Sequence, residues 1–131
     1  MTPISEIGKD MTMITALDHI QLALPAGSED DLRAFYCDYL GMVEMPKPAP
    51  LAGRGGFWAR AGQLEVHFGV DPDFHPARKA HPAFIVANLD DLARDLTDAG
   101  YAITWDMALP DVKRCFTHDP VGNRIELIAQ S

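Results

Sequence analysis

The sequence predicts one α+β domain built from two similar modules, each with the element order βαβββ. The first observation is a histidine–glutamate pair that occurs twice: His19 precedes Glu65 by 46 residues, and His81 precedes Glu126 by 45. The second is that both halves show the same succession of alternating, helical and turn-rich segments. The third is the length of 131 residues, which suits a single domain, whereas either half alone is too short to enclose a core.

The first module is predicted to span residues 17–70. An alternating strand over 17–24 is broken by Pro25-Ala26-Gly27, and Ser28 is a suitable N-cap for the helix that follows. The inner face of that helix repeats at helical spacing and contains Leu32, Phe35, Tyr36 and Tyr39. After the helix ends at Leu40-Gly41, we expect a short strand over 42–45, a Pro- and Gly-rich loop over 46–56, and a hairpin of strands 57–61 and 64–70.

The second module is predicted to span residues 81–131 and to follow a polar linker over 71–80. A strand over 81–87 leads to a helix that Asn88 or Asp90 caps. The inner face of this helix contains Leu89, Leu92 and Leu96, and Gly100 closes it. We expect the remaining elements to be a strand over 101–105, a loop over 106–112, and a hairpin of strands 113–117 and 124–129 with its turn at 119–123.

Bulk composition narrows the class of protein. A net charge of −8 with scattered basic residues argues against nucleic acid as a partner. No apolar run approaches about 20 residues, so no membrane-spanning helix is expected. The two cysteines are dispersed, which fits a reducing compartment and predicts a cytoplasmic protein. Residues 1–16 are interpreted as a leader that lacks the pattern of a signal peptide, with Met11 or Met13 as alternative starts.

Three passages resemble the glyoxalase/bleomycin resistance protein/dioxygenase superfamily, which has the vicinal oxygen chelate fold. They are Asp18-His19-Ile20, the helix end from Phe35-Tyr36 to Leu40-Gly41, and the Asp-Pro-Val-Gly-Asn-Arg-Ile-Glu-Leu sequence over 119–127. The resemblance covers residues 17–129. It implies that the two βαβββ modules form an eight-stranded, half-open barrel. It also implies a homodimer. A dimer is favoured independently, because an open sheet has free strand edges that another chain can cover.

The resemblance implies a metal site as well. Metal enzymes of the superfamily hold one divalent ion with a side chain from the first and the last strand of each module, and the matching positions here are His19, Glu65, His81 and Glu126. The internal repeat selects the same four residues. Imidazole and carboxylate ligands suit Zn²⁺, Ni²⁺, Mn²⁺, Fe²⁺ or Co²⁺. His67 is an alternative to Glu65, because residues two apart on a strand share a face.

These features favour a metal-dependent lyase or isomerase that chelates a small α-oxygenated carbonyl substrate and transfers a proton. Glu126 and Glu65 are the candidate proton-transfer groups, and Arg114 is a candidate substrate-binding residue. The main alternative is a metal-free small-molecule binding protein of the bleomycin-resistance type, which would lack the four ligating residues. Extradiol dioxygenases, fosfomycin-modifying transferases and acyl-CoA epimerases remain further alternatives. Neither nucleic acid nor a membrane is expected as a partner.

Overall fold

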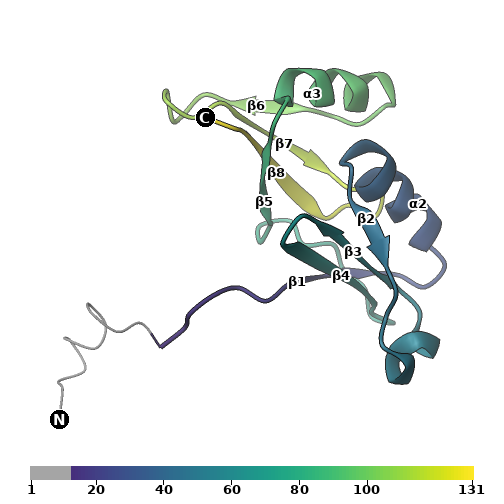
Figure 1. Ribbon diagram of the computed structural model, residues 1–131. Coiled ribbons are helices and arrows are strands. Elements are labelled where there is room, and N and C mark those ends of the chain that lie inside the picture. Colours follow the sequence, from purple (N-terminus) through teal and green to yellow (C-terminus); the bar gives the residue numbers. More distant parts are fainter. Residues whose placement is uncertain (1–12) are drawn as a thin grey trace, which may run out of the picture.

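The structure is a computed structural model that describes residues 13–131. Most of the predicted leader over 1–16 lies outside the described residues. The part that is described leads away from the body of the protein, and Met13, Ile14 and Leu17 are exposed (Figure 1). No helix among residues 13–131 combines the length and the apolar character that a bilayer crossing requires.

The first module forms a four-stranded sheet with the order β1-β4-β3-β2. Strands β1 and β4 are parallel, and the other neighbours are antiparallel. A continuous helix of one α-helical part and one π-helical part connects β1 to β2. The elements are β1 (Ile20–Leu24), α2 (Glu29–Arg33), η1 (Ala34–Tyr39), β2 (Val43–Met45), the 3₁₀ helix η2 (Ala49–Arg54), β3 (Phe57–Ala61) and β4 (Leu64–Val70).

The second module repeats this plan with the sheet order β5-β8-β7-β6. Its first and last strands are again parallel and its other pairs antiparallel. Figure 1 shows this module above the first, with α3 at the outer end. Its elements are β5 (Ala83–Val86), α3 (Leu89–Asp98), β6 (Thr104–Asp106), β7 (Arg114–His118) and β8 (Arg124–Ala129). The predicted fold class and element order are therefore confirmed.

Some local expectations differ from the structure. The loop predicted over 46–56 contains the 3₁₀ helix η2. Ser28 precedes α2, but its hydroxyl donates to the carbonyl oxygen of Pro25 at 2.7 Å rather than accepting from the helix. Strands β1 and β5 begin at Ile20 and Ala83, so His19 and His81 lie just before the strands instead of opening them.

One hydrophobic core joins the two modules. Leu32, Phe35 and Tyr36 from the helix of the first module are fully buried, as the helical spacing predicted, whereas Tyr39 is 38% exposed at the end of the same face. They pack in one cluster with residues of both sheets, among them Leu24, Val66, Phe68, Phe84, Leu96, Ile125 and Leu127.

The Asp-Pro-Val-Gly-Asn turn has a structural role at the junction of the modules. The buried Tyr36 hydroxyl donates to Asp119 Oδ2 at 2.7 Å. Asp119 Oδ1 accepts from the backbone amides of Val121 and Asn123, which closes the turn. Asn123 then donates its side-chain amide to the carbonyl oxygen of Ala23 at 2.9 Å. These bonds satisfy buried polar groups and fix one module against the other.

Candidate metal centre

Strand alternation places the predicted ligands on the sheet faces that point away from the core. In β4, Val66 and Phe68 are buried in the core, so Glu65 and His67 lie on the opposite face. In β8, Ile125 and Leu127 are in the core and Glu126 lies on the opposite face. Each sheet therefore presents part of the predicted ligand set on its own outer face.

The half of the site in the second module contains a tightly oriented histidine. His81 Nδ1 is 2.8 Å from the carbonyl oxygen of Lys79, and its Nε2 is 2.9 Å from Glu126 Oε1. A carbonyl oxygen only accepts hydrogen bonds, so Nδ1 carries a proton. Nε2 and the carboxylate then need a second proton or a cation between them, because two lone pairs facing each other at this distance repel.

The separation of these two atoms suits a shared ion. The distance of 2.9 Å is that of an N–H···O hydrogen bond, and it also leaves both atoms close enough to bind one ion. A histidine whose other ring nitrogen donates to a backbone carbonyl is also the usual arrangement of a metal-binding imidazole. His81 and Glu126 therefore fit a metal pair by both criteria.

Arg114 holds Glu126 in place. Its guanidinium donates to Glu126 Oε2 at 3.1 Å and to Asp106 Oδ2 at 3.1 Å. Burial raises the pKa of Glu126, but the hydrogen bonds from His81 and Arg114 outweigh burial, so the pKa lies below its ordinary value. Glu126 is thus an ionised, fixed carboxylate. In this structure the two terminal nitrogens of Arg114 bind protein carboxylates. Its contact with a substrate remains a prediction.

The half of the site in the first module is a stack of three rings. His67 lies between His19 and Trp58, with ring centroids 3.9 Å from His19 and 3.6 Å from Trp58. His67 Nε2 is 3.0 Å from Glu65 Oε1. His19 Nδ1 is 2.8 Å from Asp18 Oδ1, which leaves His19 Nε2 as the nitrogen with a lone pair for a ligand.

Sequence reasoning did not assign roles in the site to Asp18 and Trp58. The direct adjacency of Asp18 to His19 was the available signal, because a carboxylate beside a metal-binding histidine commonly sets its tautomer. No comparable signal marks Trp58, whose contact with His67 depends on the register of β3 against β4.

The register of the strands changes which residues of the two modules correspond. The amide of Asp71 donates to the carbonyl oxygen of Leu24, and the amide of Gln130 donates to that of Val86, each at 2.9 Å. These bonds occur at the same place in each module. When residues are counted back from these bonds in each module, His19 is at the same position as His81. Glu126 is then at the same position as His67, not Glu65. The sequence overlay that paired Glu65 with Glu126 is displaced by two residues.

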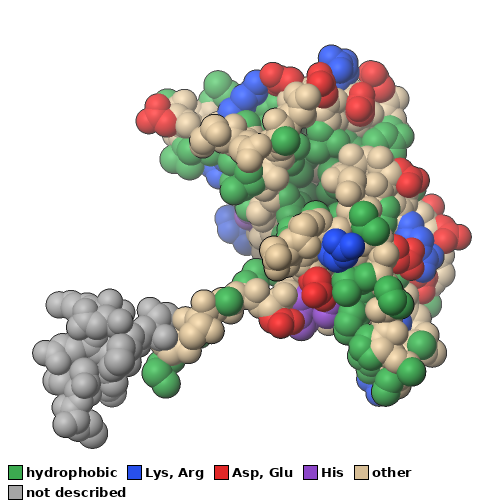
Figure 2. Space-filling model, in the orientation of Figure 1, with side chains coloured by type: hydrophobic (Ala, Val, Ile, Leu, Met, Phe, Trp, Pro, Cys, Tyr) green, Lys and Arg blue, Asp and Glu red, His purple; other side chains and the backbone are tan. Residues whose placement is uncertain are grey.

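The two halves of the site do not converge within one chain. Over residues 13–131, no three His, Cys, Asp or Glu side chains are grouped closely enough to hold an ion together. In the space-filling view, histidines lie at the surface beside acidic side chains (Figure 2). Of the four predicted ligands, His81 and Glu126 form one pair, whereas in the first module His19 contacts Asp18 and Glu65 contacts His67.

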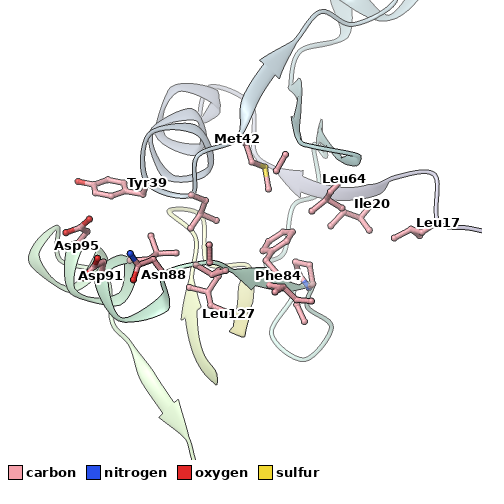
Figure 3. A pocket seen from close by; sticks show the side chains of 18 residues that line it. Leu17, Ile20, Tyr39, Met42, Leu64, Phe84, Asn88, Asp91, Asp95 and Leu127 are labelled. Carbon is pink, nitrogen blue, oxygen red and sulfur yellow. The ribbon is translucent and has the colours of Figure 1, made fainter. Parts of the chain in front are cut away.

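An apolar groove of about 930 Å³ is lined by residues of both modules. Figure 3 shows its walls, which come from β1, β4, β5 and β8 and include Ile20, Leu64, Phe84 and Leu127. Asn88, Asp91 and Asp95 form a polar rim at one end. Ile85 on β5 also lines the groove and is 72% exposed. Strands β1 and β5 each pair on one side only, so each leaves a free edge.

The fold is similar to that of a solved glyoxalase family protein from Bacillus anthracis. The two are 44% identical, the TM-score is 0.86, and the match covers 92% of this chain and 98% of that one. A glyoxalase/dioxygenase from Nostoc punctiforme is 19% identical with a TM-score of 0.69, covering 92% and 98%. The fosfomycin resistance protein FosX from Listeria monocytogenes is 15% identical with a TM-score of 0.72, covering 91% and 96%. No protein-family model and no curated protein sequence matches the chain.

Proposed function

Because the chain belongs to the glyoxalase family of the vicinal oxygen chelate superfamily, we propose that it is a metal-dependent lyase or isomerase acting on a small α-oxygenated carbonyl compound. The observation that carries the proposal is the arrangement of His81. Its Nδ1 is committed to the Lys79 carbonyl, and its Nε2 faces the Glu126 carboxylate at 2.9 Å. That arrangement is also found where an imidazole and a carboxylate bind one metal ion, and it supports the proposal.

His19, His81 and Glu126 would hold the ion, with a fourth ligand from β4. The pseudo-symmetry between modules favours His67 over Glu65 for the fourth position. With His67 the set is three imidazoles and one carboxylate, and with Glu65 it is two of each; either mixture suits Zn²⁺, Ni²⁺, Mn²⁺, Fe²⁺ or Co²⁺. Such an ion, when bound, supplies a Lewis acid beside the carbonyl oxygen of a substrate.

Glu65 is the better placed of the two carboxylates to move a proton. Glu126 is held by His81 and Arg114, and these bonds lower its pKa and weaken it as a base. The Glu65 side chain is 35% exposed and bonds only to His67 among the described residues. A carboxylate in this position would take the proton from the carbon next to the substrate carbonyl, and His67 would orient it.

We also propose a homodimer in which each site is shared between subunits. The first-module half of one chain, with His19 and His67, would face the second-module half of the other, with His81 and Glu126. Support comes from the separation of the halves in one chain and from the free edges of β1 and β5. The apolar groove would be covered by the partner subunit.

The dimer can be tested with one exposed groove residue and a matched control. Ile85→Lys places a charge on the free edge of β5, and we expect sedimentation to change from dimer to monomer. Leu109→Lys is the control, because Leu109 is 49% exposed but does not line the groove. A monomeric parent protein at tens of micromolar would contradict the proposal.

The function itself is tested by metal analysis followed by a substrate screen. Elemental analysis after loading should show about one ion per chain, and His81→Ala should lose it. Metal-loaded protein is then screened with 2-oxoaldehyde–thiol adducts, catechols and acyl thioesters. We expect Glu65→Gln to lower turnover about 10²-fold or more while metal binding is retained.

The alternative function, sequestration of a drug without metal, has one supporting observation. The groove of about 930 Å³ is within the size range of drug-binding pockets. Tight binding of an aromatic drug by metal-free protein, with no turnover in the screen, would favour this alternative.

A further inference from the structure

We propose that the pocket formed by the 46–56 loop binds an anionic group of the substrate, a carboxylate or a phosphate. The inference rests on the proposed function, because it names the class of substrate for the same site. The pocket has a volume of about 260 Å³ and is lined by ten residues, among them Gln21, Lys47, Arg54, Trp58 and His67. A pocket of this size suits one end of a small molecule.

The pocket adjoins the first-module half of the candidate metal centre. Trp58 and His67 belong to both, and their rings stack at 3.6 Å with an angle of 1°. A ligand bound in the pocket would therefore lie next to the His19–His67 stack. Gly69 leaves room for the Gln21 side chain, because a Cβ there would clash with the Gln21 amide. That amide provides a neutral hydrogen-bond donor in the same pocket.

The side chains that line the pocket carry positive charge, although the protein is acidic. The chain has a net charge of −8, yet the ten lining residues include two cationic side chains and no acidic one. Arg33, Arg94, Lys113 and Arg114 each form an ion pair with an acidic residue. Within residues 13–131, Lys47 and Arg54 have no acidic side chain in ion-pair range. Their charges are therefore available to an anion.

The loop backbone holds the Lys47 side chain in position, and Arg54 is the last residue of the 3₁₀ helix η2 in the same loop. Lys47 donates one of its three protons to the carbonyl oxygen of Gly55, which leaves two. Glu29 contacts the loop, and its oxygens accept from the amides of Gly27 and Gly56, each at 3.0 Å. Glu29 therefore anchors the backbone instead of neutralising the pocket.

Fluorescence of Trp58 tests the proposal. The chain has two tryptophans, so Trp105→Phe leaves Trp58 as the single reporter. In metal-free protein of this background, we expect benzoate or phenyl phosphate to give a saturable change in emission. The tighter of the two identifies the anion as carboxylate or phosphate. Equal binding of the neutral benzyl alcohol would overturn the proposal.

Charge variants supply the decisive comparison. Arg54→Gln and Lys47→Met should each weaken binding of the tighter probe about 10-fold or more, and Lys47→Arg should largely restore it. Arg94→Gln changes net charge equally on α3 and should stay within about twofold of the parent. Unchanged binding in Arg54→Gln and Lys47→Met would overturn the proposal. Metal binding is measured separately on the same proteins, so failure of the metal centre and failure of the anion pocket give different results.

Discussion

His67 of β4 and Glu126 of β8 occupy equivalent positions in the two modules. Their equivalence follows from the hydrogen bonds that fix β4 against β1 and β8 against β5. Both side chains lie on the outer face of a sheet and yet are only 6% exposed. Neighbouring rings cover His67, and His81 and Arg114 cover Glu126. This correspondence decides which residue of β4 is expected to act as a ligand.

The first prediction concerns that ligand. His67→Ala should weaken metal binding about 10-fold or more, because it removes a nitrogen donor at the position equivalent to Glu126. Glu65→Gln should weaken it less, because Glu65 contacts His67 and would act on the metal only indirectly. Titration calorimetry with Mn²⁺ or Ni²⁺ compares the two variants. A larger loss in Glu65→Gln would assign the fourth ligand to Glu65 instead.

The second prediction concerns Arg114. Arg114→Met leaves Glu126 buried without its cation, so the pKa of Glu126 should rise and metal affinity should fall about 10- to 100-fold. Carbon-13 NMR of the Glu126 carboxyl group in metal-free protein measures the pKa directly. Arg124→Met is the control, because Arg124 lies over the Phe116 ring at 4.1 Å. An unchanged Glu126 pKa in Arg114→Met would show that Arg114 does not position the carboxylate.

The third prediction is a pH dependence that arises from Glu29. Hydrogen bonds from the amide of Gly56 and then from other backbone amides hold the pKa of Glu29 below its ordinary value of 4.5, against the opposing effect of burial. A lowered pKa in the folded state stabilises the protein above the unfolded value, and this stability is lost as pH falls through the folded value.

Glu29→Gln should therefore lower the free energy of unfolding at pH 7 by about 1 kcal/mol, after allowance for solvent screening. The difference from the parent should disappear in acid, as the parent loses the contribution. Urea unfolding at several pH values gives both curves, with exposed Asp31→Asn as the control. A difference that stays constant down to pH 3 would contradict the assignment.

The fourth prediction compares two glycines in the left-handed region. Gly56 has φ +72°, and a Cβ there would clash with the carbonyl oxygen of Phe68. Gly62 has φ +59°, and a Cβ there meets nothing within 4 Å. Thermal unfolding should show a loss of about 1 kcal/mol in Gly62→Ala and of at least about 2 kcal/mol in Gly56→Ala. Equal losses would mean that the backbone near Phe68 adjusts freely.

The periodicities of the sequence were sufficient to predict the elements and their order, and the half-open barrel was implied by the resemblance to the superfamily. The helical spacing of Leu32, Phe35 and Tyr36 corresponds to three fully buried side chains. The turn over 119–123 also forms, closed by Asp119. Alternation also identified the face on which Glu126 lies.

The sequence did not predict the register of parallel strands. That register depends on hydrogen bonds between segments more than 40 residues apart, and a count of spacing cannot distinguish Glu65 from His67 on one face. The partners of Arg114 were also missed, because Asp106 joins it only when β6 pairs with β7.

The central claim is that each metal centre is completed by two subunits, and mixed variants test it most directly. His19→Ala alters the first-module half, and His81→Ala alters the second-module half, so each protein alone should bind almost no metal. After the two are unfolded together and refolded, half of the dimers are mixed, and each mixed dimer regains one intact site. Elemental analysis should then find about one ion per four chains. Metal content that stays at the level of the separate variants would contradict a shared site.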